Sequence, residues 1–145
     1  MTQNQTCLFC AASGGKLVWE NRYFRVVAPD EPQYPGFVRI ISQEHLTEFT
    51  QLTPPQREEL MHLLAVIEGE MIAVMNPIKV NLASLGNQVA HHHWHVIPRF
   101  ADDPCFPDAI WSAPKRSVSE DVLDTRQKQA EKFLAALTKK LQVSV

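Results

Sequence analysis

The stretch His91-His92-His93-Trp94-His95-Val96-Ile97 places three histidines at two-residue spacing directly before an apolar pair. Side chains of a β-strand alternate between its two faces, so we expect His91, His93 and His95 to share one face. His92 and Trp94 would then lie on the other. Four histidines in five positions, in a chain that has six, exceed what ordinary surface or core packing explains. Because imidazole titrates near neutral pH, such a face can supply a nucleophile, a proton donor, a phosphate ligand or a metal site.

The segment before the histidines predicts a neighbouring strand. Lys79–Leu85 has a strand-like composition, and Gly86-Asn87-Gln88 is typical of a turn because Gly and Asn tolerate positive φ. Pro98 lacks a backbone donor and marks a strand end or an edge. We therefore expect a hairpin or a neighbouring strand pair whose turn folds over the histidine face. Three polar side chains would reach that face: Asn81, Asn87 and Gln88.

The rest of the sequence predicts three more strands and two long helices. Strand-like segments lie at Lys16–Glu20, Tyr23–Val27 and Gly36–Ile41. A capping box at Thr53 begins a helix that Asn76-Pro77 ends, and an amphipathic helix runs from about Ser119 to Lys140. We expect an α+β fold, a five-stranded antiparallel sheet with a long helix packed on it and a C-terminal helix.

Length, charge and cysteine count restrict the class of protein. At 145 residues we expect one domain, and a formal net charge of −2 gives no general attraction to nucleic acid. An anionic ligand must then be held by a local site. No apolar run reaches membrane-spanning length, and the polar start Met1–Gln5 is unlike a signal peptide. Three cysteines, an odd count, do not resemble a disulfide framework, so we expect a cytoplasmic protein without nucleic-acid or membrane partners.

The stretch Gly86–Arg99 resembles the signature of the histidine triad superfamily, in which single residues separate three histidines and apolar residues follow. Asn81–Asn87 and Trp94–Phe100 are similar to a bacterial branch described as diadenosine-tetraphosphate-hydrolase-like. The resemblance covers residues 7 to 116, from the Cys7-Leu8-Phe9-Cys10 start onward. It implies a histidine triad domain over residues 1–116, a C-terminal helical extension over 117–145 packed on the same domain, and a homodimer.

The resemblance also implies a chemistry. The family's nucleophile is the middle histidine, here His93, while His91 and His95 would position the phosphate and set the tautomer of His93. Asn87 would contact phosphate or bridging oxygens. A neutral imidazole attacks phosphorus well, and the phosphoramidate that it forms is itself reactive, so one difficult transfer becomes two easier ones. We expect a nucleotide hydrolase or transferase acting at the α-phosphate of a dinucleoside polyphosphate, a nucleoside phosphoramidate or an acyl adenylate, through a nucleotidyl-histidine intermediate.

Other positions carry weaker expectations. In this family ribose is recognised from the loop before the third strand, where Asp30 is the nearest match. Trp111 is expected to close over a ligand or a partner subunit, because strand alternation sends Trp94 to the core. Gln88 stands where several members have a hydroxyl thought to help the leaving group depart. His92 stands where members have an apolar residue, so it needs a hydrogen-bond partner or solvent.

The cysteines point to a metal. Cys7, Cys10 and His45, with His91 as a candidate fourth ligand, match a structural zinc site seen in some family members. The chemistry itself would need no cofactor. Two alternatives stay open, a zinc-dependent enzyme that uses the histidine cluster and a non-catalytic nucleotide-binding regulator. An intact His93 disfavours the regulator, because a pure binder needs no nucleophile.

Overall fold

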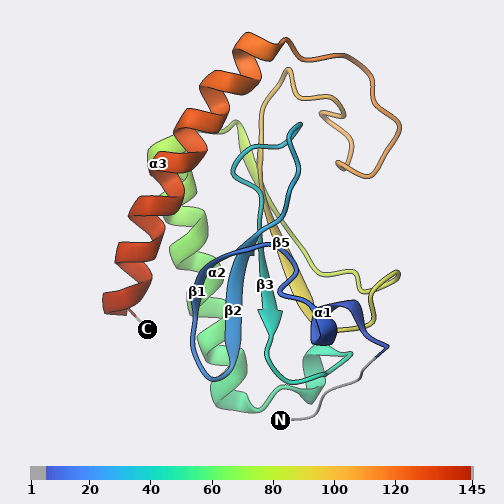
Figure 1. Ribbon diagram of the computed structural model, residues 1–145, viewed down its shortest axis with the longest axis vertical. Helices are drawn as coiled ribbons and strands as arrows, with labels where there is room; N and C mark the ends of the chain where they lie inside the picture. The colour runs from blue at the N-terminus through green and yellow to red at the C-terminus, as the bar shows by residue number, and fades with distance from the viewer. Residues whose placement is uncertain (1–5, 145) are drawn as a thin grey trace.

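The computed structural model describes residues 6–144 and shows one five-stranded antiparallel sheet (Figure 1). The order across the sheet is β1-β2-β3-β5-β4. The predicted α+β class is confirmed, with β4 and β5 as antiparallel neighbours. The strands are β1 (Lys16–Glu20), β2 (Phe24–Ala28), β3 (Val38–Ser42), β4 (Lys79–Ala83) and β5 (His93–Arg99).

The long helix α2 (Pro54–Met75) begins where the sequence predicts. Thr53 Oγ1 accepts from the Gln56 amide at 3.4 Å, and Gln56 Oε1 accepts from the Thr53 amide at 2.9 Å. This capping box satisfies two amides that a helix start leaves unpaired. Asn76 ends the helix in the left-handed region, with φ 48° and ψ 52°. A short 3-10 helix, η1 (Phe49–Gln51), precedes it.

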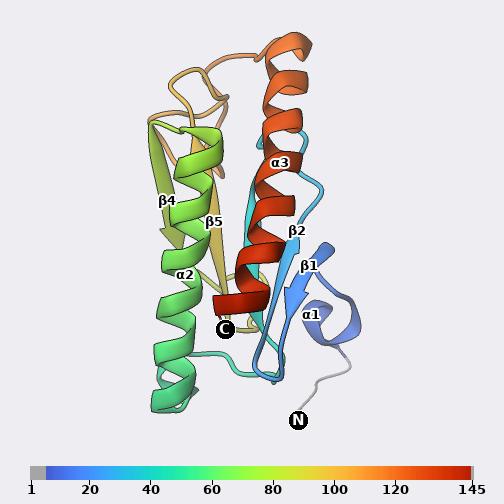
Figure 2. The ribbon, with the colours of Figure 1, turned by 90° about the vertical axis from the view of Figure 1, so that its left-hand side faces the viewer.

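Helices α2 and α3 (Glu120–Ser144) lie side by side on one face of the sheet (Figure 2). Their apolar stripes and inward residues of β2, β3, β4 and β5 form one buried cluster, to which α3 contributes Ala130, Phe133, Leu137 and Leu141. The C-terminal helix therefore packs into the same core as the sheet. It continues to Ser144, beyond the end predicted near Lys140. In the described part of the chain, no helix has the length and apolarity needed to span a membrane.

The opposite face of the sheet is covered by a short helix and loops. The helix α1 (Leu8–Ala11), the segment 84–92 and the loop 104–116 lie away from α2 and α3 (Figure 1). Phe9 packs there on Val27 and Ile41, and Phe37 packs with Ile97. This helix-free face receives the side chains of β5 that alternate away from the main core.

The strand that carries the histidines begins at His93, two residues later than the alternating pattern predicts. The backbone of His92 bonds to the end of β3 and to the segment after it instead: the His92 amide donates to Leu46 O at 2.6 Å, and His92 O accepts from the Ser42 amide at 3.1 Å. From His93 onward the alternation is confirmed. Trp94 packs against the helical core, as predicted, while His93 and His95 line a pocket on the other face.

His92 finds the hydrogen-bond partner that its buried position requires. Trp94 Nε1 donates to His92 Nε2 at 3.1 Å, and the Phe49 ring packs against both rings. Burial, with smaller effects from His93 and His91, lowers the pKa of His92 to about 4. The neutral ring can therefore act as the acceptor at neutral pH.

Candidate active site and metal cluster

His93 and His95 open into a pocket of about 300 Å³ on the helix-free face. Aromatic rings form a row along it: the centroid of His93 lies 4.9 Å from that of Phe9 and 4.8 Å from that of His95, and His95 lies 4.9 Å from Trp111. The structure thus brings together five residues named from the sequence. The full lining is Phe9, Arg39, Leu85, Gly86, Asn87, Gln88, Val89, His93, His95 and Trp111.

One ring nitrogen of His93 is fixed and the other is left for chemistry. Nδ1 lies 2.6 Å from the carbonyl oxygen of His91. A carbonyl only accepts, so Nδ1 carries the proton and Nε2 keeps its lone pair in the neutral ring. Burial lowers the pKa of His93, and the positive charge of Arg39 lowers it further against the opposing effect of the His91 carbonyl. The ring is therefore neutral and basic at Nε2 at neutral pH.

His95 is braced between two aromatic rings. Its centroid lies 5.5 Å from Phe37 and 4.9 Å from Trp111, both nearly edge to face. Burial, together with His93 and Arg39, lowers the pKa of His95 to about 4. Its Nδ1 is buried and has no partner among the described residues. Leaving such an atom unpaired is costly, which fits a group that meets a ligand.

The turn between β4 and β5 forms one wall of the pocket. Gly86 adopts a φ of 74°, which side chains disfavour, and Asn87 and Gln88 follow it with exposed amides that line the pocket. Ser84 Oγ donates to the carbonyl of His93 at 2.8 Å, so the start of the turn is tied to the histidine strand. The predicted turn over the histidine face is confirmed.

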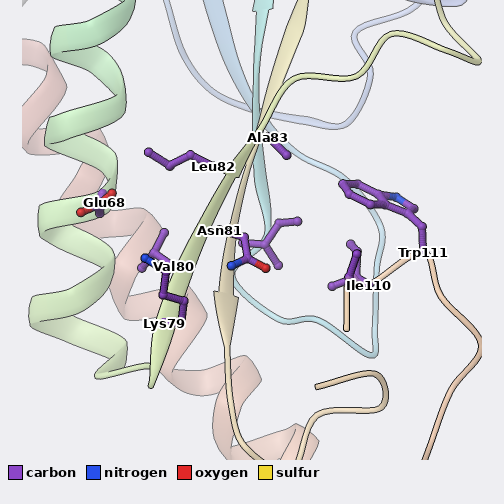
Figure 3. Close-up of a pocket in the computed structure, with 10 residues that line it drawn as sticks. Glu68, Lys79, Val80, Asn81, Leu82, Ala83, Ile110 and Trp111 are labelled. Carbon is purple, nitrogen blue, oxygen red and sulfur yellow. The ribbon is translucent and has the colours of Figure 1, made fainter. Parts of the chain in front are cut away.

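Figure 3 shows a second hollow, of about 410 Å³, and Trp111 lines both this hollow and the histidine pocket. Asn81 of β4 lines this hollow beside Ile110, and it does not line the histidine pocket. Its Oδ1 accepts from Arg99 Nη1 at 2.9 Å. The amide of Asn81 is therefore engaged in holding Arg99.

A buried ion pair anchors the segment that carries Trp111. Arg99 donates to both carboxylate oxygens of Asp103, at 2.8 and 3.0 Å, and both side chains are 2% exposed. Arg116 Nη1 donates to the carbonyl of Phe106 at 2.8 Å and closes the loop. Trp111 remains 51% exposed at the mouth of the pocket, where a ligand can reach its ring.

Asp30 does not join the histidine pocket. It is exposed and lines a separate hollow of about 500 Å³ between the proline-rich loop and α3. The loop leaves β2 toward α3, where Gln127 and Glu131 complete that hollow. The structure therefore separates Asp30 from the histidines.

Cys7, Cys10, His45 and His91 form a cluster beside the pocket, with their donor atoms all within 4.8 Å of one another. His91 Nδ1 lies 3.3 Å from Cys7 Sγ, 3.5 Å from Cys10 Sγ and 3.3 Å from His45 Nδ1. Cys10 Sγ lies 3.3 Å from His45 Nδ1. The four donors come from α1 and its N-cap, the segment after β3 and the segment before β5.

This geometry fits a tetrahedral metal ion. Zinc bonds to nitrogen and sulfur of about 2.0–2.3 Å imply ligand atoms about 3.3–3.8 Å apart. His91 Nε2 lies 2.6 Å from the carbonyl oxygen of Ser42, which fixes the proton on Nε2 and leaves Nδ1 to the cluster. The cluster could therefore hold a metal ion. The imidazole of His91 faces this cluster and not the pocket, while its carbonyl holds His93.

Phe9 and Arg39 line the pocket from outside the segment that joins β4 to β5, and neither was predicted from the sequence to do so. Arg39 alternates with buried Val38 and Ile40 inside β3. A charged residue between two apolar ones in a central strand is the sequence feature that could have indicated Arg39 as a site residue. Phe9 carries no such signal, because it reaches the pocket from a short helix far away in sequence.

Fold and site together define a histidine triad protein. A protein-family model for the HIT domain matches residues 12–102, so the chain belongs to the HIT family. The protein called Protein hit of Bacillus subtilis (strain 168) is 21% identical over 141 residues, which cover 91% of this chain and 97% of that protein.

Solved structures show the same fold. A histidine triad protein from Bradyrhizobium japonicum matches with a TM-score of 0.71 and 20% identity, over 88% of this chain and 91% of that chain. A Zn-bound histidine triad family protein from Mycobacterium smegmatis matches with a TM-score of 0.64 and 20% identity, over 97% of this chain and 99% of that chain.

Proposed function

We propose that this protein is a nucleotide hydrolase or transferase acting at the α-phosphate of a nucleoside phosphate derivative. The observation that carries the proposal is the state of His93, a buried neutral imidazole with Nδ1 fixed by a carbonyl and Nε2 left basic at a pocket. Membership of the HIT family supports the same class of activity.

The proposed reaction has two steps. His93 Nε2 attacks the α-phosphorus, and an N–P bond forms as the bond from phosphorus to the bridging oxygen or amine nitrogen breaks. The leaving group departs with that electron pair and takes a proton from solvent. Water then attacks the phosphorus, the N–P bond breaks, and a nucleoside monophosphate is released. The His91 carbonyl holds the Nδ1 proton and stabilises the ring while Nε2 carries the nucleotide.

The substrates we propose are dinucleoside polyphosphates, such as diadenosine tetraphosphate, or nucleoside phosphoramidates. His95, Asn87 and Gln88 would contact phosphate oxygens, because they line the pocket with His93. Trp111 would cover the bound group at the pocket mouth, and Asn81 would meet only the distal part of a larger substrate. We place this activity in the cytoplasm and in a single domain that includes α3.

Two alternatives are weaker on this geometry. A metal held by the three triad histidines is disfavoured because His91 Nδ1 faces Cys7 and His45. Among the residues described, the group of candidate ligands close enough to share one ion contains His91 and neither His93 nor His95. A nucleotide-binding regulator would use the same pocket without turnover, and a turnover measurement separates it from the enzyme.

The test is replacement of the proposed nucleophile. His93→Ala should lower turnover of the best substrate by at least about 10³-fold, while nucleotide binding measured by calorimetry stays near that of the wild type. Mass spectrometry of the wild-type protein quenched during turnover should find a nucleotide on His93. His62→Ala, on the exposed side of α2, is the matched control. Wild-type turnover in His93→Ala would overturn the mechanism.

We also propose that the Cys7, Cys10, His45 and His91 cluster holds a structural zinc ion. The donor types and their separations support this ion, as does the hydrogen bond that orients His91. The Zn-bound relative from Mycobacterium smegmatis is consistent with it. The ion would tie α1 to the sheet and take no part in the phosphate chemistry.

A further inference from the structure

Three arginines lie on the helix-free face, and one of them differs in its hydrogen bonding. Arg25 donates from all three side-chain nitrogens to backbone carbonyls and an amide oxygen. Arg99 donates from all three to Asp103 and Asn81. Arg39 donates from Nη1 to the carbonyl of Gly14 at 3.2 Å, and its buried Nε has no partner among the described residues. Buried donors without partners are rare in folded proteins, so the free Nε of Arg39 is consistent with a donor that meets a ligand.

Arg39 lies directly beside the histidine strand. It is the partner of His95 in the ladder between β3 and β5. Its guanidinium carbon lies 5.6 Å from the ring centroid of Phe9 and 5.5 Å from that of Phe37. The same two rings touch the triad, since Phe9 packs on His93 and Phe37 on His95. Aromatic contacts therefore hold the guanidinium at the wall of the pocket.

The charge of Arg39 has no counter-ion inside the pocket. Among the described residues that line it, Arg39 is the one permanent charge, and no carboxylate accompanies it. The charge of Glu31 raises the pKa of Arg39, but Glu31 lines a separate hollow. Burial lowers the pKa of Arg39, but a guanidinium stays charged at neutral pH. In a chain of net charge −2, this pocket is therefore locally positive.

We propose that Arg39 binds the phosphate chain beyond the α-phosphate and makes the site selective for leaving groups that are themselves anionic. The inference rests on the proposed function and chooses between its two substrate classes. A guanidinium matches the spacing of phosphate oxygens and can donate two N–H groups at once. A dinucleoside polyphosphate offers further phosphates to Arg39. A phosphoramidate with a neutral amine offers none, and one with a cationic amine is repelled.

The experiment separates charge from shape. Arg39→Met keeps an unbranched stem over the two rings and removes the charge, whereas Arg39→Lys keeps the charge. We expect Arg39→Met to lower kcat/KM for a diadenosine polyphosphate at least about tenfold more than for an adenosine phosphoramidate of a neutral amine. Arg39→Lys should retain part of the wild-type ratio. Arg22→Gln, which removes an exposed charge outside the pocket, should leave the ratio unchanged.

A binding measurement provides a readout without turnover. Calorimetric titration with ADP and AMP should show that Arg39→Met weakens ADP binding several-fold more than AMP binding. Each result compares two ligands or two substrates on the same variant. Partial unfolding lowers both values equally and so leaves their ratio unchanged. The inference would be overturned if Arg39→Met weakened ADP and AMP binding equally, lowered kcat/KM equally for the two substrates, or changed neither. If the wild type cleaves neither substrate, the proposed function fails, and the titration still decides whether Arg39 binds the second phosphate.

Discussion

His95 makes folding depend on pH through its burial. Its pKa is about 4 in the folded protein, against an ordinary value of 6.5. Between these values the unfolded chain binds more protons, so the stabilisation is fully present above pH 6.5 and is lost as the pH falls toward 4. From pH 7.5 to pH 5 this one residue should remove about 2 kcal/mol from the free energy of unfolding.

Urea unfolding of the wild type and of His95→Gln at the two pH values measures this effect. The wild type should lose about 2 kcal/mol more than the variant over this interval. Acid release of a metal would act on both proteins and cancel in the difference. An identical pH dependence in the two proteins would contradict the prediction.

For single residues, the sequence is a better guide to which side chains lie close together than to what those side chains bind. Asn87 and Gln88 line the histidine pocket because turn chemistry is a local property, whereas Trp111 reaches it from the loop that the Arg99–Asp103 pair anchors. The imidazole of His91 points into the cluster of cysteines and histidines because it meets Cys7, 84 residues away in sequence. Asp30 lies elsewhere because its loop leaves β2 toward α3, a direction that local sequence does not specify.

Elements follow the same rule. The start of α2 is predicted correctly because Thr53 and Gln56 cap it within one turn. The start of β5 is predicted two residues too early because the His92 amide pairs with Leu46, which is remote in sequence. Secondary structure fixed by neighbouring residues is thus readable from the sequence, and secondary structure fixed by distant contacts is not.

The cluster of Cys7, Cys10, His45 and His91 joins three segments, so losing the proposed zinc ion should loosen α1 from the sheet. Untagged protein should carry about one zinc ion per chain by elemental analysis. The double variant Cys7→Ser, Cys10→Ser should carry almost none and melt at a lower temperature, because metal-binding energy contributes to folding. Cys105→Ser, which removes a buried thiol outside the cluster, should keep its zinc. A wild-type zinc content well below half an equivalent would contradict the proposed site.

At the level of the whole molecule, the apolar face of α2 that runs toward the sheet is not the surface that could pair two chains. The apolar stripe from Leu60 to Met71 is buried inside the protomer, where it packs on the sheet and α3. Some of the exposed apolar residues belong to α2 and to the edge strand β4. Met61 and Ile72 of α2 are 43% and 48% exposed, and Leu82 on the edge strand β4 is 41% exposed. An edge strand flanked by exposed apolar residues is a site for pairing with a second copy.

We predict a homodimer that uses this edge. Light scattering at micromolar concentration should give twice the chain mass of 16.5 kDa. Leu82→Asp should shift the protein toward the monomer, because a carboxylate is costly to bury at an interface. Leu17→Asp, at a 48% exposed position on the opposite edge strand β1, should leave the dimer intact. A wild-type protein of monomer mass would contradict the prediction.

The two chemical groups of His91 serve different neighbours. Its imidazole faces the cysteines, and its peptide carbonyl fixes the proton of His93. A substituted residue 91 would keep the carbonyl and lose the imidazole, so reduced activity in such a variant would report a disturbed metal cluster rather than a missing catalytic group. The first histidine of the motif would then be under selection together with Cys7 and Cys10. In a chain without both cysteines, the hydrogen bond from His91 Nε2 to the Ser42 carbonyl would still hold the imidazole in place.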